Sequence, residues 1–294
     1  MIRKMDTQKF ALVCLFSGVA AIALAPILVR LSETGPVATA FWRLCFALPL
    51  LWAGTWLSAR RNADVLPRSG SDWMLMAAAG LFFAADLGIW HWSLRLTTVA
   101  NATLLANFAP VFVVLGGRLF FGEHIRPLFV AGMAAALAGM VLVVGPHLRV
   151  NLTRFWGDVL GFSTAVFYAG YLLSVKRLRC RFSTMVVMAC TGTATAGGLW
   201  AAMRFTREQT VPQTANGWLV LLALAIISHA AGQGLIAYAL AHLKAGFSSV
   251  GLMLQPVLAG LLAWVLFGEI LMPVQWIGCL LVLFGIGVAR KESG

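Results

Sequence analysis

The sequence FGEHIRP at residues 121–127 ends one long apolar run and begins another, and FGEILMP at residues 267–273 repeats the pattern 146 residues later. In each copy, a Gly can take the left-handed conformation that ends a helix. The Pro that closes each copy suits the first turn of the next helix, where its missing N–H would have no partner. The motif therefore predicts one helical hairpin in each half of the chain.

The composition is that of a membrane protein. Of the 294 residues, 61% are hydrophobic and only 11% are charged, and the mean hydropathy is +0.88. A soluble domain carries about 25% charged residues, so this chain has too few charges to cover a globular surface. The net charge of +12 comes from Lys and Arg in short loops, which indicates membrane orientation and not nucleic-acid binding.

We predict an all-α polytopic membrane protein with ten transmembrane helices. A bilayer core needs about 20 apolar residues per helix, and runs of this length recur between stretches rich in Pro, Gly and charge, which end helices. The predicted helices cover residues 9–30, 36–58, 72–95, 99–120, 126–145, 156–177, 183–203, 216–240, 246–267 and 273–290.

The repeated motif belongs to a duplication that spans the chain. A shift of 146 residues without gaps aligns Phe16 with Phe162, Ala84 with Ala230, Pro110 with Pro256, and Gly139 with Gly285. We therefore predict two five-helix repeats, residues 1–150 and residues 151–294. Because five is odd, the second repeat enters the membrane from the opposite side, which is the inverted-repeat architecture of many secondary transporters.

Basic residues predict the orientation of the chain. Of the 22 Lys and Arg residues, fifteen lie at the termini and in the loops on the same side as the termini, and six lie in the opposite loops. Cytoplasmic loops are enriched in Lys and Arg, so we expect both termini in the cytoplasm.

The chain resembles the drug/metabolite transporter superfamily, EamA type, across residues 9–290. The resemblance rests on the two FGE ends and on ADLGIWHWSL (85–94) and VANATLLANFAPVF (99–112). It implies a transporter, not an enzyme, that exports amino acids or related small metabolites across the bacterial inner membrane by alternating access. The implied partners are a small-molecule solute and the lipid bilayer. The aromatic amino-acid exporters of the superfamily are one analogy for the solute.

Other functional classes lack their signatures. The chain contains no H-E-x-x-H and no paired acids on facing helices for an intramembrane enzyme, and no P-loop for an ATP-driven pump. Its five cysteines have no metal-binding spacing, so we predict neither a metal nor a cofactor. A membrane scaffold or receptor without transport, and a facilitator of drug-like amphiphiles, remain alternatives.

The two glutamates of the repeated motif, Glu123 and Glu269, are expected at opposite membrane surfaces. We predict that both lie near helix N-termini, whose dipoles favour anions. Two roles remain open for the motif: it folds the hairpin, or it contacts the substrate directly.

A charge pair is predicted at membrane depth. Asp86 is the single carboxylate in the middle of a predicted helix, and Arg43 lies inside the preceding one. At 1.5 Å per residue, both lie about 10–14 Å from the external ends of their helices, so we expect them to pair. The pair is either a static ion pair or a coupling site for a proton or a substrate amine.

Polar and aromatic residues on several helices complete the candidate site. Asn107 and Gln255 lie close to Pro110 and Pro256, whose predicted kinks free backbone carbonyls at equivalent positions of the two repeats. The aromatic residues indicate a partly apolar organic solute. For each single hydroxyl or amide, helix-to-helix hydrogen bonding is the alternative role. The predicted substrate-binding residues are Ser17, Phe83, Asp86, Trp90, His91, Asn107, Phe108, Ser163, Tyr168, Tyr171, His229, Gln233 and Gln255.

Small residues mark the last predicted helix of each repeat. GMAAALAG (132–139) and GCLLVLFG (278–285) place glycines seven residues apart on one helix face. Such a face suits close helix packing or dimerisation, and both a monomer and a homodimer remain open.

Overall fold

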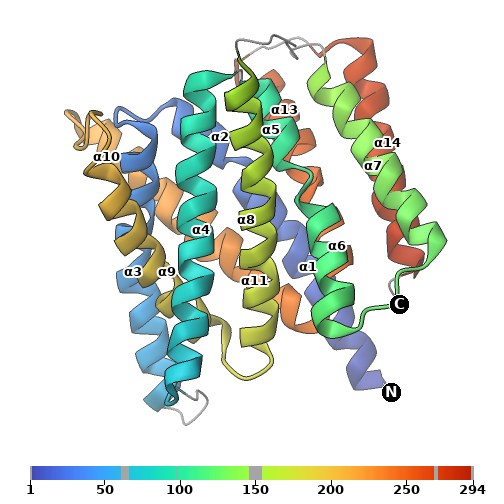
Figure 1. The fold of residues 1–294 in the computed structure, drawn as a ribbon, viewed down its shortest axis with the longest axis horizontal. Coiled ribbons are helices and arrows are strands. Elements are labelled where there is room, and N and C mark those ends of the chain that lie inside the picture. Colours follow the sequence, from blue (N-terminus) through green and yellow to red (C-terminus); the bar gives the residue numbers. More distant parts are fainter. Residues whose placement is uncertain (1, 61–65, 98, 146–153, 268–270, 293–294) are drawn as a thin grey trace. The chain divides into compact units, whose positions relative to one another are not determined.

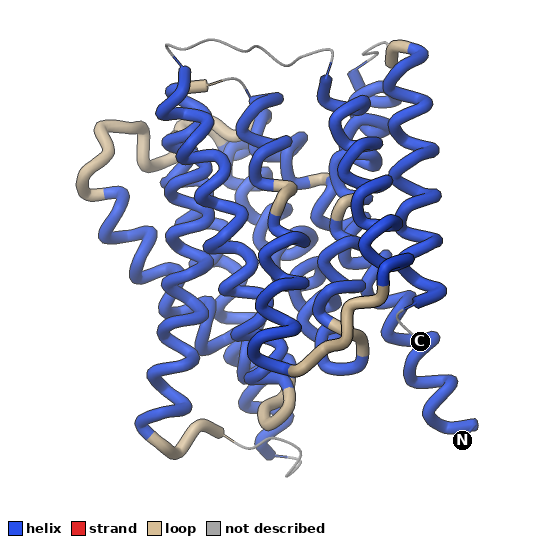
Figure 2. The backbone as a smooth tube through the Cα atoms, turned by 45° about the vertical axis from the view of Figure 1, so that its right-hand side comes forward, coloured by secondary structure: helices blue, strands red, loops and turns tan. Residues whose placement is uncertain are grey.

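The computed structural model describes residues 2–60, 66–97, 99–145, 154–267 and 271–292, and all regular structure in these ranges is helical (Figures 1 and 2). Within them, ten helical segments are long and apolar enough to cross a membrane. The predicted all-α class with ten transmembrane segments is therefore confirmed.

The helices follow the predicted ranges closely. They are α1 (Ile2–Ala23), α2 (Ala25–Arg30), α3 (Pro36–Arg60), α4 (Gly70–Leu96), α5 (Val99–Ala106), α6 (Ala109–Phe121), α7 (Pro127–Val144), α8 (Phe155–Arg179), α9 (Thr184–Met203), α10 (Ala215–Ala223), η3 (Leu224–Gln233), α11 (Gly234–His242), α12 (Ala245–Leu252), α13 (Leu254–Phe267) and α14 (Pro273–Glu292). The largest difference is at α1, which begins at Ile2 and not at residue 9. Apolar runs mark the part of a helix that crosses the membrane, and a helix can continue into polar turns beyond it.

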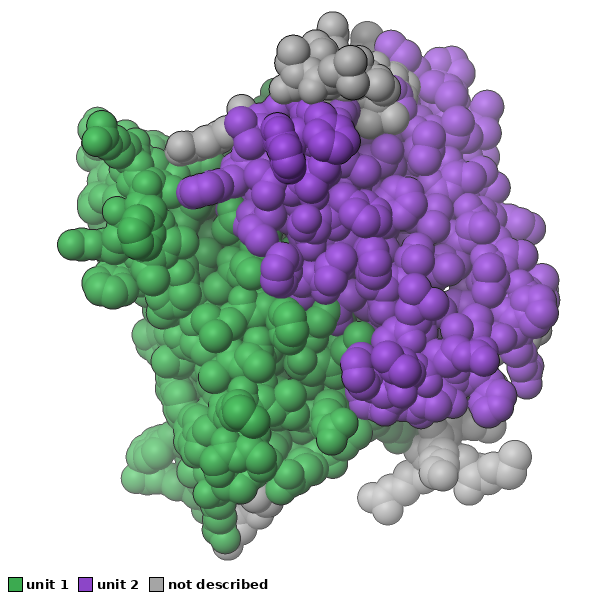
Figure 3. Space-filling model, in the orientation of Figure 1, with its two compact units in different colours: residues 1–88, 170–242 green, residues 89–169, 243–294 purple. Residues whose placement is uncertain are grey.

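The chain packs into two compact units (Figure 3). Residues 1–88 and 170–242 form unit 1, and residues 89–169 and 243–294 form unit 2. Each unit thus combines segments from both predicted repeats. The predicted repeats are duplicated stretches of sequence, whereas the units are groups of helices that share a core. The duplication stays a prediction.

Unit 1 is held together by tight apolar packing and by polar bonds between helices. Leu44 on α3 and Leu199 on α9 are fully buried in one apolar cluster. The Thr195 hydroxyl of α9 donates to the Gly80 carbonyl of α4 at 2.9 Å, which satisfies a hydroxyl that would be costly in an apolar interior.

In unit 2, α7 and α14 lie side by side along their length (Figure 1). A Cβ atom at Gly132 would lie 2.8 Å from the Gly285 carbonyl oxygen, and one at Gly139 would lie 2.7 Å from the Gly278 carbonyl oxygen. Glycine allows two helix backbones to approach this closely. The sequence analysis predicted either close helix packing or dimerisation for these glycines. The structure shows close packing between two helices of one chain.

Three membrane segments are interrupted near a proline. α1 ends before Pro26, α5 ends before Pro110, and α12 ends before Pro256. A proline removes a backbone hydrogen bond and its ring crowds the preceding turn, which accounts for breaks at these points. Pro110 and Pro256 are the positions at which the sequence analysis placed kinks.

The repeated motif has the local structure that its residues predict. Gly122 ends α6 with a φ of 63°, in the left-handed region. Pro127 begins α7, and Pro273 begins α14. The hairpin roles predicted for Gly122 and Pro127 are confirmed, whereas Gly268 and Glu269 of the second copy lie outside the described residues.

Candidate functional site

Three ionisable side chains from different helices come together in unit 1. Arg43 belongs to α3, Asp86 to α4 and His229 to η3. The Arg43 guanidinium acts electrostatically on both the Asp86 carboxylate and the His229 ring. Arg43 and His229 are buried, and Asp86 is half-buried. The structure therefore places Arg43 and Asp86 in one electrostatic cluster, and His229 joins them from a third helix.

Near-parallel aromatic rings border this cluster. The rings of Phe83 and Tyr171 stack with centroids 4.4 Å apart and an interplanar angle of 17°. The Phe83 and His229 rings have centroids 6.0 Å apart at 21°. Stacked rings of this kind pack favourably, and both Phe83 and Tyr171 are buried. The cluster thus combines a cation, a carboxylate, an imidazole and aromatic surface.

His229 lies in a π-helical segment that the sequence analysis did not predict. In η3, the wider turn carries Ser228, His229 and Gln233, all buried. The Ser228 hydroxyl donates to the Ala21 carbonyl of α1 at 3.3 Å. Single π-turns inside α-helices occur frequently at functional sites. Hydrophobic periodicity could not reveal this one, because a π-turn changes backbone hydrogen bonds without changing residue type.

Two buried side chains of η3 carry polar atoms that have no hydrogen-bond partner among the described residues. Neither ring nitrogen of His229 has a partner among the described residues, and neither does the Oε1 atom of Gln233. Most buried polar atoms in proteins are hydrogen-bonded, so each exception requires a physical explanation.

The remaining predicted site residues of unit 2 include two whose polar groups bond to their own helices. The Asn107 amide donates to the Thr103 carbonyl at 2.8 Å, and the Ser163 hydroxyl donates to the Val159 carbonyl at 2.8 Å. Both bonds run within one segment, so they are not the helix-to-helix hydrogen bonds that were the alternative to substrate contact. Gln255, on α13, has a buried Nε2 atom without a partner in the described part of the chain.

Aromatic candidates of unit 2 pack with neighbouring rings. Trp90 meets His91 edge to face with centroids 5.0 Å apart, and Phe108 packs against Phe162 at 5.9 Å. Tyr168 is half-buried on α8. In unit 1, the predicted Ser17 is exposed on α1 and is not part of the cluster around Arg43.

One polar cluster in unit 2 was missed by the sequence analysis. The Asp158 carboxylate, in the first turn of α8, accepts hydrogen bonds from the Thr97 hydroxyl at 2.6 Å and from the Asn101 amide at 3.1 Å. The nearby Ser93 hydroxyl donates to the Gly157 carbonyl at 2.9 Å. An acid in the first turn of a helix suits the helix dipole, but spacing along the chain does not reveal its partners 57–61 residues away.

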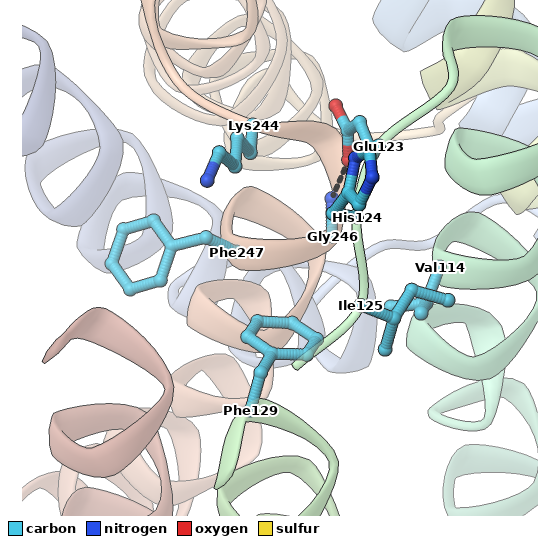
Figure 4. A pocket seen from close by; sticks show the side chains of 8 residues that line it. All are labelled: Val114, Glu123, His124, Ile125, Phe129, Lys244, Gly246 and Phe247. Atoms are coloured by element: carbon cyan, nitrogen blue, oxygen red, sulfur yellow. Dashed lines mark hydrogen bonds between the residues drawn. The ribbon is translucent and has the colours of Figure 1, made fainter. Parts of the chain in front are cut away.

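The carboxylate of Glu123 binds the start of a distant helix. It accepts hydrogen bonds from the backbone N–H groups of Ala245 at 3.1 Å and Gly246 at 3.5 Å (Figure 4). These are the first residues of α12, so the prediction that Glu123 lies near a helix N-terminus is confirmed. The sequence analysis favoured a role in the local hairpin, whereas the structure shows a tie between α6 and α12.

A small hollow of about 20 Å³ surrounds this tie (Figure 4). It is lined by Val114, Glu123, His124, Ile125, Phe129, Lys244, Gly246 and Phe247. Most of these residues lie at helix ends and in the turn between α6 and α7, away from the mid-span polar residues. We therefore assign the hollow to the capping contact and not to the solute site.

Two further glutamates in unit 1 cap helices reciprocally. Glu33 follows α2, and its carboxylate accepts hydrogen bonds from the Thr214 hydroxyl and from the backbone N–H groups of Thr214 and Gln213, at the start of α10. Glu208 precedes α10, and its carboxylate accepts from the Ala38 N–H in the first turn of α3 at 2.7 Å. The Thr214 and Gln213 donors hold the pKa of Glu33 below its ordinary value.

Metal ligands do not cluster in the part of the chain that the structure describes. No group of three or more His, Cys, Asp or Glu side chains is placed to hold an ion there. The five cysteines are free thiols.

Comparisons with known proteins agree with this architecture. The sequence profile of the EamA-like transporter family matches residues 9–145 and, separately, residues 155–290. The chain is 26% identical to the pseudopaline exporter CntI of Pseudomonas aeruginosa over 241 residues, which cover 81% of this chain and 82% of that protein. It is 30% identical over 238 residues to a probable terminal-alkyne amino-acid exporter of Streptantibioticus cattleyicolor, covering 77% and 76% of the two chains.

A solved crystal structure has the same fold. It matches with a TM-score of 0.81 and 23% sequence identity, and the match covers 96% of this chain and 97% of that one. At this sequence identity, the match establishes the fold of the chain and does not identify its solute.

Proposed function

Because the chain belongs to the EamA-like transporter family, we propose that it exports amphiphilic solutes of the amino-acid class across the bacterial inner membrane. Transport is secondary and proceeds by alternating access between two inverted repeats, residues 1–150 and 151–294. Both termini lie in the cytoplasm, and the protein works in the bilayer as a monomer or a homodimer. The two separate family matches support the repeats.

The observation that carries the proposal is the cluster of Arg43, Asp86, Phe83 and Tyr171 in unit 1. A guanidinium binds a carboxylate through paired hydrogen bonds, and a carboxylate binds an ammonium group. Stacked rings accept an apolar side chain. Charged residues inside membrane segments are costly and mark solute or ion pathways. A zwitterion with an apolar side chain complements all three features.

The named relatives support the same class of solute. One is named as an exporter of pseudopaline and another as a probable exporter of a terminal-alkyne amino acid. Both names describe export, which supports the proposed direction.

Coupling to protons runs through Asp86. The positive charge of Arg43 favours the ionised form of the Asp86 carboxylate, whereas removal from water favours the neutral form. Separation of the two side chains during the transport cycle allows Asp86 to take up a proton. A solute carboxylate that engages Arg43 promotes this separation.

Counterflow in liposomes tests the proposal. Purified protein is reconstituted, the vesicles are loaded with unlabelled L-phenylalanine, and uptake of labelled L-phenylalanine is followed, with labelled L-leucine and L-tryptophan as further probes. We expect accumulation that is lost in Arg43→Gln, which removes the guanidinium that binds the solute carboxylate. If the wild-type protein moves none of the three amino acids, the proposal fails, and a drug-like amphiphile such as ethidium then tests the facilitator alternative.

A further inference from the structure

The unpartnered polar atoms of η3 define a binding subsite within the unit 1 cluster. We propose that His229 and Gln233 bind the ammonium group of the transported solute. This inference rests on the proposed function and assigns one part of its site. Its basis is that both side chains are buried, with exposures of 1% and 4%, and that three of their polar atoms have no partner among the described residues.

The count of donors and acceptors selects the group that binds. A neutral imidazole has one N–H donor and one acceptor nitrogen, and the Oε1 atom of Gln233 is an acceptor. The subsite therefore offers two acceptors and one donor. An ammonium group carries three N–H donors, so it can satisfy both acceptors at once. A carboxylate has no N–H and would leave both acceptors without a bond.

The N–H donor of the His229 imidazole can also take part in binding the solute. Arg43 lies close enough to act electrostatically on the His229 ring. A solute carboxylate bound to Arg43 can accept a second hydrogen bond from this N–H. The α-ammonium and α-carboxylate of an amino acid are attached to the same carbon atom. One amino acid can therefore reach both the η3 acceptors and Arg43.

The surroundings suit a group that adds no net charge. Among the described residues, Arg43 from α3 acts on the His229 ring and also on Asp86 from α4, which can carry the opposite charge. On the other sides, His229 meets Phe83 from α4 and lies near Gly192 of α9, where a Cβ would be 3.9 Å from its Nε2 atom. Burying an isolated charge costs more than burying a compensated pair, which favours a zwitterion over a simple cation.

Ordered water is the other explanation for unpartnered buried polar atoms. Water and an ammonium group make different predictions about solutes. A subsite that holds only water does not distinguish a solute with an amine from the same solute without one.

The experiment compares three probes that differ in one group each. L-Phenylalanine, 3-phenylpropanoate, which lacks the amine, and 2-phenylethylamine, which lacks the carboxylate, compete against labelled L-phenylalanine counterflow in liposomes. We expect wild-type protein to prefer L-phenylalanine over 3-phenylpropanoate by about tenfold or more, as loss of hydrogen bonds to a charged group requires. Gln233→Leu should bring this preference towards one while the affinity for 3-phenylpropanoate stays unchanged. His229→Leu should also lower the preference, and it should weaken the binding of 3-phenylpropanoate as well, because it removes the N–H from which the solute carboxylate accepts.

Rescue and matched controls separate recognition from folding. His229→Asn, which keeps a donor and an acceptor, should recover part of the preference. His124→Leu and Gln209→Leu change an exposed histidine and an exposed glutamine outside the cluster and should leave the preference at its wild-type value. Leucine variants that transport L-phenylalanine with the full wild-type preference would overturn the subsite and leave the proposed function intact. Absence of any wild-type L-phenylalanine counterflow would overturn both.

A second measurement does not depend on variants that fold well. The chain has five histidines, so ¹⁵N ring resonances of labelled wild-type protein in nanodiscs can be resolved and assigned with His229→Asn. L-Phenylalanine should shift the His229 ring nitrogens, and 3-phenylpropanoate should shift them less. Equal shifts with both probes would show that the ring does not contact the amine.

Discussion

The Glu123 carboxylate accepts a hydrogen bond from the Ala245 N–H at 3.1 Å, which joins the residue after α6 to the first residue of α12, 122 positions away. Two glycines make this contact possible. Gly122 turns the chain in the left-handed region, and Gly117 leaves room, since a Cβ there would lie 2.9 Å from the Glu123 carboxylate. The first N–H groups of a helix have no partner within it, and a carboxylate satisfies them and the helix dipole together.

Loss of this carboxylate should weaken the start of α12. Glu123→Ala is expected to lower the free energy of unfolding by about 1–2 kcal/mol, the cost of a lost helix cap. Glu123→Gln keeps an acceptor and should lose less. Hydrogen exchange of the Ala245 and Gly246 amides should speed up in Glu123→Ala, whereas His124→Ala, a change of the exposed neighbour, should leave it unchanged. Protection that does not change would mean that the bond contributes nothing to the helix start.

The contact between α7 and α14 should tolerate no side chain at Gly139. A Cβ there would lie 2.6 Å from the Val282 backbone nitrogen, so Gly139→Ala should destabilise the protein by about 1–3 kcal/mol, as overpacking does. Gly287→Ala on α14 is the matched control, because a Cβ at Gly287 meets nothing within 4 Å. Thermal unfolding in detergent measures both variants, and equal midpoints would contradict the close packing.

Acid should weaken the cap that Glu33 provides to α10. The folded-state pKa of Glu33 is lowered by hydrogen bonds from Thr214 and Gln213, so its stabilising contribution is fully present above the unfolded pKa of about 4.3. The contribution is lost as the pH falls through the lower, folded-state pKa. The stability difference between wild type and Glu33→Gln should therefore be constant near neutral pH and shrink in acid. Thr214→Val, which removes the hydroxyl donor, should reduce this pH dependence, and a difference that grows in acid would contradict the cap.

The charge pair of Arg43 and Asp86 should show coupling in a double-mutant cycle. Arg43→Gln and Asp86→Asn each leave one charge without its counter-charge inside the membrane segment. Breaking a fully buried pair costs about 3–5 kcal/mol, and the cost here should be smaller because Asp86 is half-buried. The double variant should be more stable than the sum of the single effects predicts. Additive losses would place the two charges too far apart to interact.

The same carboxylate should carry the pH dependence of transport. Asp86→Asn resembles the protonated form, so flux driven by a pH gradient should be abolished while exchange between two solute pools continues. Flux and exchange are measured in the same liposomes with L-phenylalanine. Transport by Asp86→Asn with an unchanged pH dependence would assign Asp86 a structural role.

The proposed orientation of the chain rests on its basic loops and is open to a direct test. A reporter that is active only in the cytoplasm, fused after residue 294, should be active, and one that requires export should be inactive. The opposite pattern would place the C-terminus outside and contradict the proposed topology.

The sequence by itself determined the class of the protein and the positions of its helices. About 20 consecutive apolar residues admit few structures other than a membrane-crossing helix, and Gly122 and Pro127 end and begin helices through their own backbone restrictions. Such signals are local, so they can be read without knowledge of the partners. The turn at 122–126 and the helix breaks near Pro110 and Pro256 belong to this group, whereas the break near Pro26 was not predicted.

Tertiary structure decided which distant residues meet. The sequence indicated that Glu123 lies near a helix N-terminus but not that the helix is α12, because a hydrogen bond over 122 positions depends on how the helices pack. The hydrogen bond between Asp158 and Thr97 also depends on how the helices pack, and so do the contacts of Phe83 with Tyr171 and His229. Tertiary structure also decided the π-helical segment that carries His229 and Gln233. The residue types of this segment are equally compatible with an ordinary α-helix. Local backbone preferences act between near neighbours, whereas the candidate site is made of side chains brought together only by the packing of four separate helical segments.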